Sequence, residues 1–168
     1  SVDDVVRILT TDDVRDACDL FAPIFRRSGG IDGRVSIEVD PRLARETRAT
    51  VEQGKELWSI VDRPNVLIKV PATTEGLGAI TDLTAHGISV NVTLIFSVDR
   101  YLQTFEAFMR GLEKRLSDGK EISNITSVAS LFVSRIDSSV DSLLKAGQSP
   151  AHSSLLGRAA VANATLAY

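Results

Sequence analysis

Cysteine is nearly absent from this sequence, because the 168 residues contain only Cys18. One cysteine cannot form a disulfide within the chain, so we expect a protein of a reducing compartment such as the cytoplasm. Cys18 falls on the apolar side of a predicted helix. A thiol in that position is expected to fill the core and not to act as a nucleophile.

An excess of basic residues and a long apolar run are also missing. The chain has 19 Lys and Arg against 22 Asp and Glu, a net charge of −3, so we expect no nucleic-acid partner. No apolar run approaches the ~20 residues of a membrane span, and the acidic start does not resemble a signal peptide. We therefore expect no membrane association.

Two nucleotide-binding motifs are absent as well. No Gly-x-Gly-x-x-Gly follows the first predicted strand, and no phosphate loop ends in Gly-Lys-Ser/Thr. Their absence argues against a dinucleotide or a nucleoside triphosphate as ligand. We expect neither a metal nor a cofactor.

The apolar pattern alternates between strands and helices along the whole chain. Such alternation predicts parallel strands connected by helices, and therefore an α/β fold in a single domain over residues 1–168. A linker is expected over residues 147–150. The predicted strands span residues 34–40, 66–71, 89–96 and 127–135, and the predicted helices span about 10–28, 41–61, 75–85, 97–117, 138–145 and 154–168.

A lysine interrupts the second strand. Lys69 follows the apolar run Val66–Ile68 and lies near the carboxyl end of the strand. A lysine is rarely buried without a partner, and removal from water disfavours its charged form. A neutral amine in a pocket can attack a carbonyl, so Lys69 is a candidate nucleophile.

The other predicted strands also carry polar residues toward their carboxyl ends. Strand alternation puts Ser36 and Glu38 on one face of the first predicted strand. For the same reason Asn91 and Thr93 share one face of the third predicted strand. The carboxyl ends of parallel strands meet at one rim, where ligands bind. Glu38, assisted by the Thr93 hydroxyl, can shuttle protons for the amine.

The polar residues of this rim also have a structural interpretation. Glu38 and Lys69 alone are explained equally well by an ion pair between neighbouring strands. Asn91 and Ser130 suit sugar hydroxyls, and they also suit hydrogen bonds within the sheet, Ser130 more so than Asn91.

Two residues near the end of the fourth predicted strand also have both a functional and a structural interpretation. Arg135 can bind a phosphate through two parallel hydrogen bonds, and a surface ion pair with Asp137 or another acid explains it nearly as well. Phe132 suits a pocket wall, although the core is the default location for phenylalanine.

Four segments of the sequence carry a resemblance to a known family: Ser36–Asp40, Ile68–Gly76, Asn91–Ser97 and Ser130–Ile136. In their order and spacing they resemble transaldolase, and the resemblance covers nearly the whole chain. It implies a cofactor-free class I aldolase fold, an eightfold β/α barrel, acting in the pentose phosphate pathway.

The resemblance also implies a reaction and a set of roles. A dihydroxyacetone unit passes from a ketose phosphate, such as fructose 6-phosphate or sedoheptulose 7-phosphate, to an aldose phosphate. The implied roles are a Schiff base at Lys69, a catalytic water held by Glu38 and Thr93, substrate contacts from Asn91 and Ser130, a pocket wall at Phe132 and phosphate binding at Arg135.

One departure from the family pattern is large. The first two barrel strands, with their aspartate acid/base, and the last two strands are not in the sequence, so a partial barrel of about four parallel strands is expected. Its unpaired edges favour self-association. Two alternatives to a transaldolase are a fructose 6-phosphate aldolase of the same superfamily and a catalytically incomplete fragment that only binds or self-associates.

Overall fold

Four parallel strands form one sheet, in the order β1-β2-β3-β4, in the computed structural model, which describes residues 1–147 and 150–168. This arrangement confirms the α/β prediction and matches part of a β/α barrel. The strands are β1 (Val35–Glu38), β2 (Val66–Pro71), β3 (Val90–Ile95) and β4 (Ser127–Leu131).

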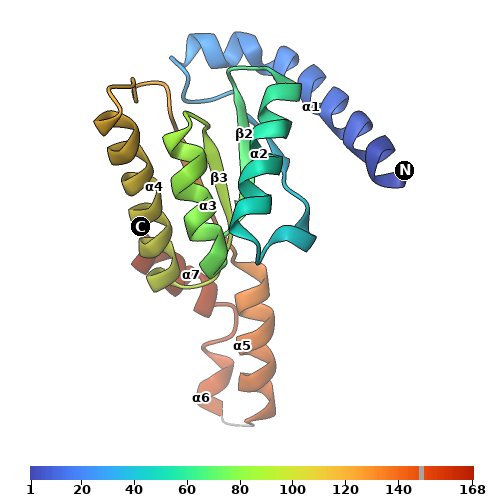
Figure 1. The fold of residues 1–168 in the computed structure, drawn as a ribbon. Helices are drawn as coiled ribbons and strands as arrows, with labels where there is room; N and C mark the ends of the chain where they lie inside the picture. The colour runs from blue at the N-terminus through green and yellow to red at the C-terminus, as the bar shows by residue number, and fades with distance from the viewer. Residues whose placement is uncertain (148–149) are drawn as a thin grey trace.

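Three helices cover one face of this sheet, as Figure 1 shows. They are α2 (Thr47–Val61), α3 (Thr74–Ala85) and α4 (Val98–Ser117). Each connects two neighbouring strands, which is the parallel crossover that the alternating pattern predicts. A 3₁₀ turn, η1 (Pro41–Leu43), precedes α2, so the single helix predicted from residue 41 is in fact two pieces.

The apolar core lies between the sheet and these helices. Ile37, Ile68, Val90 and Val92 point to the helices and are buried. The strand residues between them face the other way. Strand alternation therefore gathers the polar side chains on the face without helices.

Helix α1 (Val2–Arg27) lies beside β1 and across the amino ends of the strands (Figure 1). It begins earlier than predicted, because Ser1 and Asp4 form a capping box. Pro23 lies inside the helix and does not end it. The buried Asn65 attaches α1 to the sheet by donating from Nδ2 to the carbonyl oxygens of Cys18 at 2.9 Å and Gly33 at 2.8 Å.

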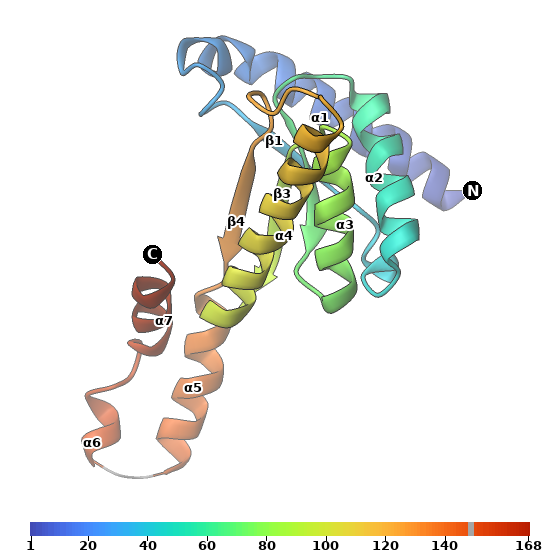
Figure 2. The same ribbon diagram turned by 60° about the vertical axis from the view of Figure 1, so that its left-hand side comes forward.

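The last part of the described chain extends beyond the carboxyl ends of the strands, as Figure 2 shows. Helices α5 (Ser134–Ala146), α6 (Pro150–Ser153) and α7 (Ala159–Ala167) replace the two helices predicted there. Residues 148 and 149 of the predicted linker lie outside the described residues. Within the described residues, no helix is both long and apolar enough to cross a membrane.

Candidate active site

Lys69 and Glu38 meet on the face of the sheet that carries no helix. They are paired positions of the parallel strands β1 and β2, so their side chains leave the sheet side by side. Lys69 Nζ lies 2.6 Å from Glu38 Oε1, with 28% of the Lys69 side chain and 62% of the Glu38 side chain exposed. Solvent and a ligand can therefore reach the amine.

Asn91 connects three strands on the same face. It is the β3 partner of Lys69 in the strand pairing. Its Nδ2 donates to Ser36 Oγ of β1 at 3.0 Å, and its Oδ1 accepts from Ser130 Oγ of β4 at 3.0 Å. Because β2 lies between β1 and β3, the Ser36 contact requires the sheet to curve toward this face.

Thr93 follows Asn91 on the same strand face and pairs with Pro71 of β2. Its side chain is buried, and no hydrogen bond to Glu38 or Lys69 is found among the described residues. Directly after it β3 contains a bulge, where Leu94 adopts a left-handed φ of 62°. Leucine rarely adopts this conformation, which costs ~1–2 kcal/mol, and bulges of this kind often adjoin active sites.

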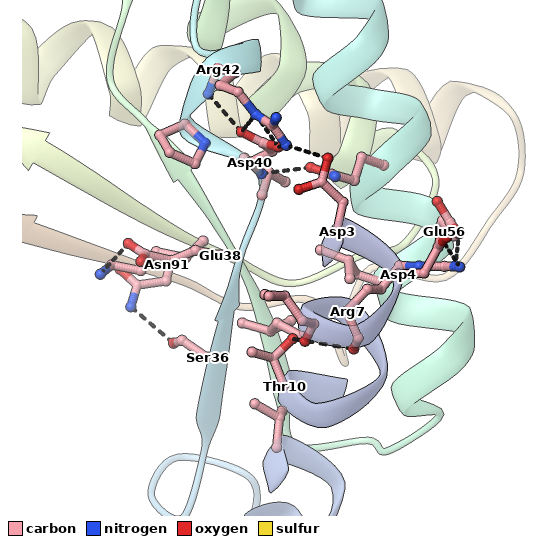
Figure 3. Close-up of a pocket in the computed structure, with 18 of the residues that line it drawn as sticks. Asp3, Asp4, Arg7, Thr10, Ser36, Glu38, Asp40, Arg42, Glu56 and Asn91 are labelled. Carbon is pink, nitrogen blue, oxygen red and sulfur yellow. Dashed lines mark hydrogen bonds and ion pairs between the residues drawn. The ribbon is translucent and has the colours of Figure 1, made fainter. Parts of the chain in front are cut away.

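A cavity of about 1030 Å³ extends along β1 and includes these side chains. Figure 3 shows Ser36, Glu38 and Asn91 on one side of the strand and α1 on the other. Lys69 and Ser130 also line the cavity. The structure thus brings four of the predicted site residues into one space: Glu38, Lys69, Asn91 and Ser130.

The α1 side of the cavity is charged, and its cations are already paired. Arg7 pairs with Glu56 of α2, and Arg42 pairs with Asp40 and Asp3. The hydrogen bonds from Arg42 hold the pKa of the Asp40 carboxyl below its usual range. A negatively charged ligand therefore finds little unpaired positive charge on this side.

The other predicted residues lie at the carboxyl ends of β3 and β4 and do not line the cavity. Phe132 contacts Phe96 with 5.3 Å between ring centroids, and the guanidinium of Arg135 lies 5.3 Å from the centroid of the Phe132 ring. Arg135 is the second residue of α5 and not a strand residue, because β4 ends at Leu131 and not at the predicted residue 135. The stack leaves Arg135 exposed.

Sequence reasoning assigned no site role to two residues of this region. Ser36 was expected on the Glu38 face, but nothing in the sequence shows that it contacts Asn91. Phe96 ends the third predicted strand and looks like an ordinary core residue, yet 40% of the residue is exposed.

The arrangement around Lys69 allows nucleophilic chemistry. An ammonium must lose a proton before its nitrogen can attack a carbonyl, and Glu38 Oε1 at 2.6 Å is within reach of that proton. Asn91 and Ser130 provide hydrogen-bonding groups for a polar ligand beside the amine. Such a site suits a substrate that carries a carbonyl group and several hydroxyls.

Comparison with known proteins gives a consistent result. The sequence pattern of the Transaldolase/Fructose-6-phosphate aldolase family matches residues 1–168. A transaldolase of Mycobacterium ulcerans is 58% identical over 167 residues, which are 99% of this chain and 45% of that protein. A transaldolase of Kocuria rhizophila is 57% identical over 168 residues, which are 100% of this chain and 46% of that protein. The chain thus spans slightly less than half the length of these relatives.

Proposed function

Because the chain belongs to the transaldolase/fructose-6-phosphate aldolase family, we propose that it carries the Schiff-base site of a transaldolase. The enzyme transfers a dihydroxyacetone unit from a ketose phosphate to an aldose phosphate in the pentose phosphate pathway. The ion pair between Lys69 and Glu38 at 2.6 Å, inside an accessible cavity, is the observation that carries this proposal.

The proposed reaction begins at Lys69. Its Nζ gives a proton to Glu38 and attacks the ketose C2 carbonyl, and loss of water leaves an iminium. The C4 hydroxyl then gives its proton to the aspartate acid/base that the family carries on an earlier barrel strand, the C3–C4 bond breaks, and the electron pair of that bond moves to the iminium to form an enamine. The aldose phosphate leaves as an aldehyde. The enamine then attacks the aldehyde of the acceptor, and water releases the new ketose from Lys69.

The remaining residues have supporting roles in this proposal. Thr93 and Glu38 hold the water that moves protons during iminium formation and hydrolysis. Asn91 and Ser130 bind the hydroxyls of the dihydroxyacetone unit, Phe132 forms a wall, and Arg135 binds the phosphate. The exposed guanidinium of Arg135, stacked on Phe132, supports the phosphate role.

Borohydride trapping tests the proposal. The reagent reduces the iminium to a stable secondary amine, which mass spectrometry locates after proteolysis. With fructose 6-phosphate we expect the adduct on Lys69, none in Lys69→Met, and an unchanged yield in Lys114→Met, whose side chain is exposed and paired with Asp82. The experiment is done on this chain and on a chimaera in which it replaces the matching segment of the Kocuria rhizophila transaldolase. A folded chimaera without an adduct on Lys69 would overturn the proposal.

The family name also includes an aldolase, which is the second candidate. An aldolase releases dihydroxyacetone in the absence of an acceptor, whereas a transaldolase holds it on the lysine. Assay of free dihydroxyacetone from the chimaera distinguishes the two activities. The relatives cited above are called transaldolases, which favours the first.

Two further properties belong to this proposal. We place the reaction in the cytoplasm, because one cysteine suits a reducing compartment. The edge strands of the described sheet, β1 and β4, each have one side without a partner strand. Such edges favour association with further strands, from a longer chain or from a second copy.

A further inference from the structure

We propose that Ser36 is a positioning residue of the site, and that it acts by fixing the carboxamide of Asn91. This inference rests on the proposed function, since it concerns how Asn91 binds a ketose beside Lys69. The observation that carries it is the pair of hydrogen bonds that holds both ends of one carboxamide, from Ser36 of β1 and Ser130 of β4.

The hydrogen bond between Ser36 and Asn91 joins two strands that are not neighbours, because β2 lies between β1 and β3. Ser36 pairs with Leu67 of β2, and Asn91 pairs with Lys69 of the same strand. The Asn91 side chain must therefore cross the inner face of β2 to meet Ser36. A hydrogen bond of this kind fixes the carboxamide next to the position where Lys69 leaves the strand.

Anchoring at both ends restricts the carboxamide more than anchoring at one. Asn91 is only partly buried and lies in an open cavity. With Ser130 as its sole partner, its side chain would be free to turn about that contact. With Ser36 as well, the plane of the group is set between β1 and β4, and a ligand meets it already oriented.

The hydrogen-bonding capacity that remains can serve a ligand. A carboxamide has two N–H donors and an oxygen with two lone pairs. Among the described residues, Asn91 uses one N–H on Ser36 and one lone pair on Ser130. One N–H and one lone pair thus remain beside Lys69, which is what a hydroxyl group of a ketose requires.

The first test observes Asn91 directly in the 168-residue chain. The two side-chain amide protons of Asn91 are identified in an ¹⁵N–¹H NMR spectrum by their loss in Asn91→Ala. Ser36→Ala is expected to shift and broaden both signals. Ser142→Ala, which removes an exposed hydroxyl bonded to Ser138 O, is expected to leave them unchanged. If the signals do not respond to Ser36→Ala, the proposal is wrong.

The second test measures the rate of adduct trapping on Lys69 at saturating fructose 6-phosphate. Ser36→Ala is expected to lower this rate about tenfold, the effect of losing one hydrogen bond, and Ser36→Thr to restore most of it. In an Asn91→Ala background, Ser36→Ala is expected to cause no further loss. Equal losses in both backgrounds would show that Ser36 does not act through Asn91.

The two tests separate this inference from the proposed function. If the unaltered chain and the chimaera form no adduct on Lys69, the proposed function fails. The amide signals of Asn91 still decide whether Ser36 fixes the carboxamide. Normal trapping in folded Ser36→Ala would reduce the Ser36 contact to a structural hydrogen bond and overturn the inference alone.

Discussion

Glu38 and Lys69 occupy paired positions of two adjacent parallel strands, and Glu38 Oε1 lies 2.6 Å from Lys69 Nζ. Both side chains are accessible to solvent, which distinguishes the pair from an ion pair sealed in a core. Its loss should therefore change the chemistry of the site far more than the stability of the fold.

Glu38→Gln tests whether loss of the ion pair affects the chemistry more than the stability. It preserves the shape of the side chain and removes the base, so we expect the trapping rate on Lys69 to fall ~100-fold or more. The free energy of unfolding should change by less than about 1 kcal/mol, because the Glu38 side chain is mostly exposed and water can solvate the amine that loses its partner. Trapping kinetics and urea unfolding provide the two measurements. Glu106→Gln, at an exposed pair with Arg110 on α4, is the matched control and should alter neither.

Arg135→Lys tests the phosphate role. A lysine retains the charge and loses the planar group that stacks on Phe132 and can make two parallel hydrogen bonds. We expect the concentration of fructose 6-phosphate needed for half-maximal trapping to rise about tenfold. Trapping with dihydroxyacetone, which has no phosphate, should be unaffected. Arg26→Lys at the exposed end of α1 is the control, and equal effects on both ketones would contradict a phosphate contact.

Gly76→Ala tests the turn that follows the Lys69 strand. A Cβ at Gly76 would lie 2.0 Å from the carbonyl oxygen of Pro71, which is backbone and cannot move aside. We expect a loss of about 3 kcal/mol in the free energy of unfolding. Gly78→Ala, two residues along the same helix, would place its Cβ 2.9 Å from Cγ2 of Thr47, a side chain that can shift where a backbone carbonyl cannot, so we expect a smaller loss. Urea unfolding compares the two, and equal effects would contradict the close approach.

Cys18 should make stability depend on pH in alkaline solution. Burial raises the pKa of its thiol, and its side chain has no exposed surface. The unfolded thiol then ionises at a lower pH than the folded one. The contribution of Cys18 to the free energy of unfolding is fully present below the pKa of the unfolded thiol. It is lost as the pH rises toward the pKa of the folded thiol, by at most ~1.4 kcal/mol per pH unit.

The measurement compares the original chain with Cys18→Ala by urea unfolding from pH 7 to pH 10. The variant is expected to be less stable at pH 7, because it leaves a cavity, and to show a shallower decline with pH. Parallel declines for the two proteins would show that the thiol does not contribute.

The sheet and the Lys69–Glu38 contact could be predicted from the sequence. The strands are apolar runs separated by helical periods, so their parallel order follows from general rules of chain connection. Glu38 and Lys69 lie near the carboxyl ends of successive strands, and parallel pairing brings such residues together. Their proximity therefore needs no information beyond strand order and alternation.

The predicted start of the first helix, near residue 10, was wrong because the residues there resemble a helix cap and α1 begins at Val2. Thr10 and Thr11 followed by two aspartates resemble a helix cap. In the structure Thr10 and Thr11 instead donate to the carbonyl oxygens of Val6 and Arg7, one turn back, and remain inside the helix. Hydroxyls that bond to their own helix in this way do not mark its beginning.

The end of β4 could not be predicted from its own residues. The apolar residues after Leu131 look like a continuing strand, but β3 ends at Ile95, whose carbonyl oxygen accepts from Phe132 N at 2.9 Å. Beyond that bond no β3 residue remains to pair. Similarly, the reach of Asn91 to Ser36 depends on sheet curvature, which arises from the packing of all four strands.

The bulge in β3 can be described as a one-residue insertion. Between the paired positions Val92–Ala129 and Ile95–Leu131, β3 has two residues where β4 has one. Without Leu94 the strand would pair regularly. Ile95 would still face the helices, because it would directly follow Thr93, which lies on the face of the sheet without helices. Leu94 is therefore not needed to direct apolar side chains to the core. Its effect is to lengthen β3 by one residue, which moves Phe96 and the Ser97 cap of α4 further toward Arg135, the proposed phosphate ligand.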